Sequence, residues 1–224
     1  VDGKFVVDYS KDGVRRSLED SLTRLGLDRV DVLHIHDPDD HYRQALDEAF
    51  PALAELRAQG VIGAIGAGMN QWEMLADFAR NADFDCFLMA GRYTLLEQDS
   101  LDFLDLCAQK GIAVFLGGVY NTGILATGAS PRAKYNYMDA PPEIMERVRR
   151  MQSICDRYRI PLRAAALQFP LAHPAVASIV IGAESRDQYS EAFEGLCLEI
   201  PPDLWQDLRQ EGLINPVAPL PGAN

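Results

Sequence analysis

A short apolar run that ends in two histidines and an aspartate is the feature that most limits the fold of this chain. Residues 30–36 read Val-Asp-Val-Leu-His-Ile-His, and Asp37 and Pro38 end the run. A β-branched run of this length is typical of a buried strand. It follows a segment with helical apolar spacing over 14–25, which Gly26 ends. Helix, glycine stop and strand make one α/β unit whose polar residues lie at the carboxyl end of the strand, where parallel sheets place their sites.

Helix-like and strand-like segments alternate along the rest of the chain. Further strands are predicted over 61–67, 84–90, 112–116 and 177–181. Further helices are predicted over 41–59, 71–81, 101–110, 141–159, 162–171, 186–193 and 202–210. Pro51 lies inside the first of these helices, where a kink is expected. A long polar loop is predicted over 126–142.

This alternation indicates a parallel sheet, and strands that are apolar on both faces fit a sheet covered by helices or closed into a barrel. An open doubly wound sheet is the alternative. No GxGxxG motif opens the first strand-to-helix turn, so the usual dinucleotide fingerprint is missing and the barrel is favoured.

The number of strands is too small for a whole barrel. A (β/α)₈ barrel needs about 250 residues, whereas only five strands are predicted, since a sixth over 4–9 is too short and weak to count. We therefore expect residues 1–224 to form one α/β domain, a partial TIM (β/α)₈ barrel. Its edge strands would be the one that contains His36 and the one over 177–181.

Composition excludes several classes of partner. The net charge of −12 argues against binding to nucleic acid or to an anionic membrane. The four cysteines are far apart in sequence, so free thiols are expected rather than a metal site. No apolar run reaches the roughly 18–20 residues of a membrane span and no signal peptide is visible, so a cytoplasmic location is expected.

Several motifs, in order along the chain, resemble those of the aldo-keto reductases, in their sugar 1-dehydrogenase branch. They occupy residues 17–28, 31–38, 64–70, 90–96, 117–125 and 211–213. The resemblance identifies the five strands as the fourth to the eighth of the barrel. It implies that the first three strands, with the family's catalytic Asp, Tyr and Lys, would lie upstream of Val1.

The resemblance implies that His36 is catalytic. Its imidazole would hydrogen-bond the substrate oxygen at the carbon that exchanges hydride and stabilise the charge that develops there. A structural core histidine is the alternative for a lone histidine on an apolar strand. His34 lies two residues back on the same face, where packing is the better interpretation.

The resemblance also implies a nicotinamide cofactor, NAD or NADP, held by residues that follow three of the strands. The candidates are Gly68, Asn70, Gly118, Val119, Tyr120, Asn121, Thr122, Gly182, Ala183, Ser185, Arg186 and Gln188. Asn70 can donate to and accept from a carboxamide, and the side chains of Asn121 and Thr122 could reach phosphate oxygens. Without the resemblance, each segment would be read as an ordinary turn.

Cofactor preference and substrate contacts follow from single positions. NADP-specific members of the family carry a Lys and an Arg where this chain has Gly182 and Gln188, so NAD is slightly favoured, although Arg186 could partly replace the missing charge. Arg92 and Tyr120 are the candidate substrate contacts. For Arg92, a salt bridge across the loops is an equal alternative.

The implied activity is the oxidation of an aldose at its anomeric carbon to a lactone, or the reverse reduction of an aldehyde. The partner would then be a small-molecule sugar or aldehyde, and the oligomeric state is not predicted. The alternative is a non-catalytic, truncated member of the family or a cofactor-binding subunit.

Overall fold

The computed structural model describes residues 7–222, and its centre is a five-stranded parallel sheet. The strands are β1 (Val30–His36), β2 (Ile62–Met69), β3 (Cys86–Ala90), β4 (Ala113–Gly117) and β7 (Val176–Val180). They pair in the order β1-β2-β3-β4-β7, so each large strand lies next to its neighbour in sequence. The five predicted strands and the predicted parallel sheet are confirmed. Of the weak candidate strand over 4–9, residues 4–6 lie outside the described residues and residues 7–9 are not in a strand.

The helices begin and end where local chemistry favours it. Helix α1 (Lys11–Leu25) begins after Ser10, whose hydroxyl accepts a hydrogen bond from the Gly13 amide. Gly26 ends α1 with a φ of 66°. The remaining long helices are α4 (Trp72–Asn81), α5 (Leu101–Lys110), α7 (Pro142–Arg157), α9 (Arg186–Cys197) and α10 (Pro202–Gln210), close to the predicted ranges.

Two helical segments differ from the prediction. The single helix expected over 41–59 is broken into a 3₁₀ turn (Asp39–His41), α2 (Tyr42–Gln44), a π-helical turn (Ala45–Ala49) and α3 (Phe50–Ala58). Pro51 therefore lies in the first turn of α3, directly after the π-helical turn. Helix α8 (Leu162–Gln168) continues as a 3₁₀ turn over Phe169–Ala172.

The loop predicted over 126–142 has structure of its own. Helix α6 (Ile124–Thr127) overlaps its start, and β5 (Lys134–Tyr135) pairs with β6 (Met138–Asp139) in a short antiparallel hairpin. Asn136 and Tyr137 form its turn with φ values of 48° and 65°. Left-handed residues of this kind match the twist of a tight hairpin.

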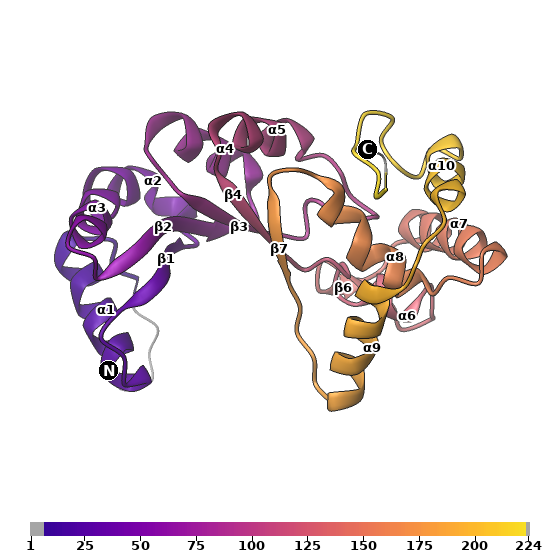
Figure 1. Cartoon of the computed structure of the whole chain (residues 1–224), viewed down its shortest axis with the longest axis horizontal. Coiled ribbons are helices and arrows are strands. Elements are labelled where there is room, and N and C mark those ends of the chain that lie inside the picture. Colours follow the sequence, from indigo (N-terminus) through magenta and orange to yellow (C-terminus); the bar gives the residue numbers. More distant parts are fainter. Residues whose placement is uncertain (1–6, 223–224) are drawn as a thin grey trace.

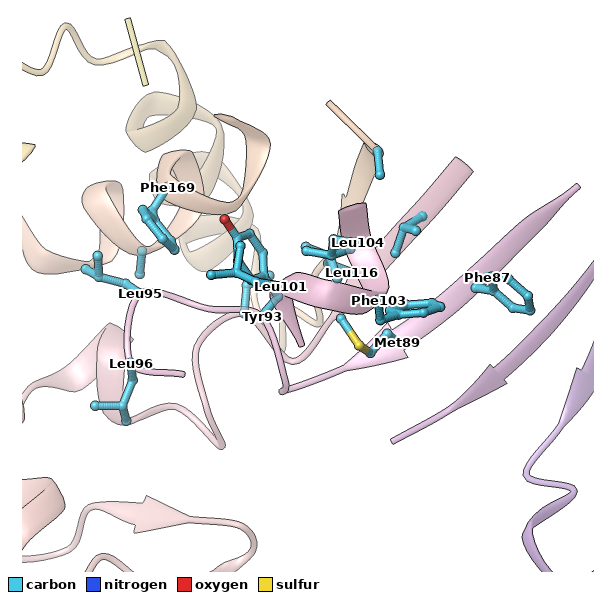
Figure 2. Close-up of a cluster of buried hydrophobic side chains, with 14 of the residues drawn as sticks. Phe87, Met89, Tyr93, Leu95, Leu96, Leu101, Phe103, Leu104, Leu116 and Phe169 are labelled. Carbon is cyan, nitrogen blue, oxygen red and sulfur yellow. The ribbon is translucent and has the colours of Figure 1, made fainter. Parts of the chain in front are cut away.

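The outer face of the sheet is buried beneath the helices. Phe87 and Met89 of β3 and Leu116 of β4 are at most 1% exposed. Figure 2 shows them next to Phe103 and Leu104 of α5. The rings of Phe87 and Phe103 lie 5.6 Å apart between centroids. The hydrophobic core thus fixes the sheet against its covering helices.

The other face of the sheet carries the two histidines and several small residues. His34 pairs in register with Gly66, which pairs with Cys86, and His36 pairs with Gly68. This row leaves room for the His34 ring to cross Gly66, because a Cβ on Gly66 would lie 2.4 Å from His34 Cδ2. The strand therefore needs glycine at position 66.

The elements follow one another along an open arc from α1 to α9 and α10 (Figure 1). Within residues 7–222, β1 and β7 each pair with only one other strand, as expected for the edges of a partial barrel. In the same part of the chain, no helix is both long and apolar enough to cross a membrane.

Candidate active site

The candidate residues follow the carboxyl ends of the parallel strands. The strand ends are aligned by register, since His36 pairs with Gly68, Ala90 with Gly117, and Gly117 with Val180. Active sites of parallel α/β folds lie beyond this edge of the sheet. The alignment brings His36 next to Gly68. It leaves Gly182–Gln188 beyond the opposite edge strand, with three strands between.

His36 ends β1 with its side chain 73% exposed. Its Nδ1 lies 3.7 Å from Oδ2 of Asp37. Asp37 has a φ of 46°, and its amide donates to Gly68 O at 2.9 Å, so the backbone turns sharply where β1 ends. The imidazole is therefore accessible to a small molecule and is carried by a hydrogen-bonded strand end.

Tyr9 supports this strand end, and sequence reasoning missed it. Its hydroxyl lies 2.7 Å from the carbonyl oxygens of both His36 and Asp37. Burial raises the pKa of the Tyr9 hydroxyl, and the charges of Asp37 and Asp39 raise it further. No sequence signal links residues that are 27 positions apart and share neither a motif nor a periodic face.

His34 packs as predicted. Its ring lies edge-on to Phe115 with centroids 6.1 Å apart, and its Nε2 lies 3.8 Å from Cys86 Sγ. Burial lowers the pKa of His34, and the charge of His36 lowers it further. A buried imidazole of this kind stays neutral more readily than an exposed one.

Gly68 and Asn70 differ in what the fold requires of them. A Cβ on Gly68 would only touch Leu88 Cβ at 3.5 Å, an ordinary contact, so the protein itself does not require glycine there. Asn70 is exposed just before α4. Its amide can therefore meet a ligand.

In the loop after β4, two of the candidate side chains face inward. Val119 is 1% exposed and packs in the core. The Asn121 amide donates to Glu97 Oε1 at 3.1 Å and to Gly91 O at 3.4 Å, and its Oδ1 accepts from Thr94 Oγ1 at 2.6 Å. Both amide donors of Asn121 are thus used within the protein, so its side chain has no free donor for a phosphate. Thr122 is exposed.

A salt bridge across the loops was the alternative to a substrate contact for Arg92. The structure instead pairs Arg92 with Glu97 of the same loop, and its contact to another loop is a hydrogen bond to the hairpin. Its guanidinium lies 3.4 Å from Glu97 Oε2 and donates to Asn136 Oδ1 at 3.3 Å. Glu97 and Thr94 were not singled out from the sequence. The apolar neighbours Leu95 and Leu96 could not reveal that these two polar side chains turn inward.

The last two candidate groups lie near α8 and α9. Burial raises the pKa of the Tyr120 hydroxyl; the charge of Arg163 lowers this pKa and the charge of Glu191 raises it. The Ser185 hydroxyl caps α9 by accepting from the Gln188 amide at 3.2 Å. Gly182, Ala183 and Arg186 are exposed in front of and at the start of this helix.

Comparison with known proteins agrees with this arrangement. Residues 1–211 match the model of the aldo/keto reductase family. Over 221 residues the chain is 46% identical to pyridoxal 4-dehydrogenase of Microbacterium luteolum, covering 94% of this chain and 65% of that protein. Over 210 residues it is 41% identical to D-threo-aldose 1-dehydrogenase from Pseudomonas sp, covering 92% of this chain and 64% of that protein. The chain therefore spans slightly less than two thirds of the length of these relatives.

Similarity to a solved structure supports the fold and carries no argument about function. The holo form of an aldo-keto reductase from Bacillus halodurans superposes with a TM-score of 0.77 at 23% identity, covering 97% of this chain and 71% of that chain.

Proposed function

The chain belongs to the aldo/keto reductase family, and from this premise we propose that the complete protein is a nicotinamide-dependent oxidoreductase. Its proposed reaction is the oxidation of an aldose at the anomeric carbon to a lactone, or the reverse reduction of an aldehyde. The relatives at 46% and 41% identity, a pyridoxal dehydrogenase and an aldose dehydrogenase, support this substrate class. The observation that carries the proposal is the exposed imidazole of His36 at the carboxyl end of β1, beside Gly68.

In this proposal His36 positions the substrate. Oxidation at the anomeric carbon removes a hydride from carbon and a proton from the attached hydroxyl. The bound nicotinamide supplies the acceptor for the hydride. His36 hydrogen-bonds the hydroxyl oxygen, fixes the direction of the C–H bond and stabilises the charge on that oxygen as its proton leaves.

The proton must go to a base. Tyr9 is poorly suited to this role because burial and the charges of Asp37 and Asp39 disfavour its phenolate. The family resemblance instead implies a tyrosine upstream of Val1. His36 alone therefore accounts for orientation and charge stabilisation, and a group beyond this chain would accept the proton.

The residues of this chain fit a dinucleotide at two places. The exposed Asn70 amide suits a carboxamide, which offers an NH₂ donor group and a carbonyl acceptor. The exposed start of α9 suits a phosphate, because helix N-termini present backbone N–H groups. A Cβ on Gly182 would meet nothing within 4 Å, so the approach to this helix is open.

The first test is kinetic. Because relatives are longer, the assay uses the complete gene product as well as residues 1–224, with L-fucose and related aldoses. We expect His36→Ala to lower kcat by about 10²–10³-fold, the usual worth of one preorganised donor, and to leave the dissociation constant of the cofactor unchanged. His36→Gln, which keeps a donor, should retain more activity. Near-normal turnover of His36→Ala would show that His36 does not act on the substrate.

The second test concerns the cofactor. Gly182 and Gln188 offer no cation and Glu184 adds a negative charge, so we expect kcat/KM with NAD to be at least equal to that with NADP. A hundredfold preference for NADP, about 2.7 kcal/mol, would mean that Arg186 or another residue binds the 2′-phosphate. If the complete protein binds NADH but turns over no aldose or aldehyde, the cofactor-binding alternative replaces the enzyme.

A further inference from the structure

A single carboxylate joins three loops at the carboxyl edge of the sheet. Glu97, with its side chain 13% exposed, lies in the loop after β3. It accepts from the Tyr135 hydroxyl of the β5–β6 hairpin at 2.6 Å and from the Asn121 amide of the loop after β4 at 3.1 Å. Its other oxygen lies 3.4 Å from the Arg92 guanidinium. Charge-assisted hydrogen bonds of this kind are about twice as strong as neutral ones.

The two loops joined to Glu97 hold unusual backbone. Six described residues other than glycine have a positive φ, and four of them lie in these loops: Asn121, Thr122, Asn136 and Tyr137. The loops also touch directly, since the Tyr137 amide donates to Thr122 Oγ1 at 3.4 Å. Such backbone persists only where the surrounding contacts enforce it. Glu97 accepts hydrogen bonds from a side chain of each of these loops, Asn121 and Tyr135.

Thr94 also holds the Asn121 side chain in place. It is fully buried, and its hydroxyl donates to Asn121 Oδ1 and accepts from the Leu96 and Glu97 amides at 3.1 and 3.0 Å. The Asn121 side chain is thereby held at both ends. Its loop can shift only if the Glu97 contacts break or the buried Thr94 is exposed.

We infer that Glu97 is a positioning residue that holds the loop after β4 and the β5–β6 hairpin in place over the carboxyl edge, where the cofactor and the sugar would bind. The inference rests on the proposed function for the identity of those ligands. The anchoring itself depends only on the contacts described above. Without Glu97, the hairpin would keep few polar ties, and its tip would swing away with Tyr137, which is 87% exposed.

Limited proteolysis measures this anchoring without any enzyme activity. Trypsin can cut after Lys134, an exposed residue at the start of β5. When opening is fast, the rate of cutting follows the population of the open hairpin. We expect Tyr135→Phe, which removes one hydroxyl and keeps the ring, to speed cutting at Lys134 about tenfold or more, the worth of a hydrogen bond to a charged group. Glu97→Ala should do at least the same, and Glu97→Gln, which keeps an acceptor oxygen, should lie between.

Tyr137→Phe is the matched control. It lies in the same hairpin, and its hydroxyl has no hydrogen-bond partner among the described residues. We expect its rate of cutting at Lys134 to equal that of the parent chain. The double variant Glu97→Ala/Tyr135→Phe should be cut no faster than Glu97→Ala, since both changes break the same contact.

Two further measurements separate positioning from general stability. In Tyr135→Phe the rates at tryptic sites outside these loops should stay the same, because a merely structural role would move them together with Lys134. The loss of stability in urea should correspond to no more than the tenfold change in cutting, because both measurements report the same lost hydrogen bond. Equal cutting of Tyr135→Phe and Tyr137→Phe would overturn the inference, even if Glu97→Ala fails to fold.

Adding NADH then tests the link to the proposed function. If the cofactor lies under these loops, saturating NADH should slow cutting at Lys134 in the parent chain and should slow it less in Glu97→Gln. An absence of protection together with fast cutting of Tyr135→Phe would refute the proposed ligand and leave the anchoring intact. Protection by NADH together with equal cutting of Tyr135→Phe and Tyr137→Phe would support the proposed ligand and refute the anchoring.

Discussion

Gly66→Ala tests how closely β1 and β2 pack on the face that carries the histidines. The new Cβ would lie 2.4 Å from Cδ2 and 2.7 Å from Nε2 of His34, and 3.0 Å from Cys86 Sγ. The ring must therefore leave its place beside Cys86. Overpacking of this kind costs about 1–3 kcal/mol, and the loss should appear as a lower midpoint of urea unfolding at an unchanged slope.

Gly68→Ala is the control, since it makes the same change two residues further along the same strand. Its Cβ would meet only Leu88 at an ordinary 3.5 Å. We expect no loss, or a gain of about 0.4–1 kcal/mol because alanine has less freedom in the unfolded chain. In addition, His34→Ala should rescue much of the Gly66→Ala loss, because the clash partner is gone. Equal costs for the two glycines, or strict additivity of Gly66→Ala and His34→Ala, would refute the steric argument.

Two further predictions concern stability. Burial lowers the pKa of His34 and of His173 in the folded chain, so the unfolded chain binds protons first as the pH falls. The stability from these two histidines should be full above about pH 6.5 and should be lost as the pH falls through their lower folded-state pKa values. A urea midpoint that is the same at pH 8 and pH 5 would contradict this. Asp85→Ala should cost about 1–3 kcal/mol, because Oδ2 accepts at 2.7 Å from the amide of the fully buried Ile65. Asp83→Ala, at a carboxylate that is 91% exposed, should cost about 0–1 kcal/mol in the same urea titration.

Elements whose ends are set by local chemistry could be predicted from the sequence. Helix α5 matches its predicted range of 101–110 because Gly111 adopts a φ of 70° directly after the apolar stripe. Helix α10 matches because Pro202 suits a first turn. The parallel sheet could be predicted for a similar reason, since each strand is a short apolar run between helices.

Features that depend on distant contacts could not be predicted. The β5–β6 hairpin has Asn-Tyr at its turn, which is not a typical hairpin pair, and it is tied down by Tyr135 contacting Glu97, 38 residues away. The same limit applies to the candidate site. A loop position such as Asn121 looks available for a ligand until its partners in the fold are known. Here Thr94 donates to its side-chain oxygen, and Glu97 and Gly91 accept from its amide nitrogen.

The order of the sheet has a consequence for how the chain folds during synthesis. Each of β2, β3 and β4 pairs with the strand made just before it, so the sheet can grow from β1 onward as residues leave the ribosome. The step from β4 to β7 is different, because it spans α6, the hairpin, α7 and α8 before Val176 can pair with Val114. Closing so long a connection is slow relative to local pairing. We therefore expect nascent chains that end shortly before β7 to expose the edge of β4, which makes this the stage at which a chaperone would be needed most.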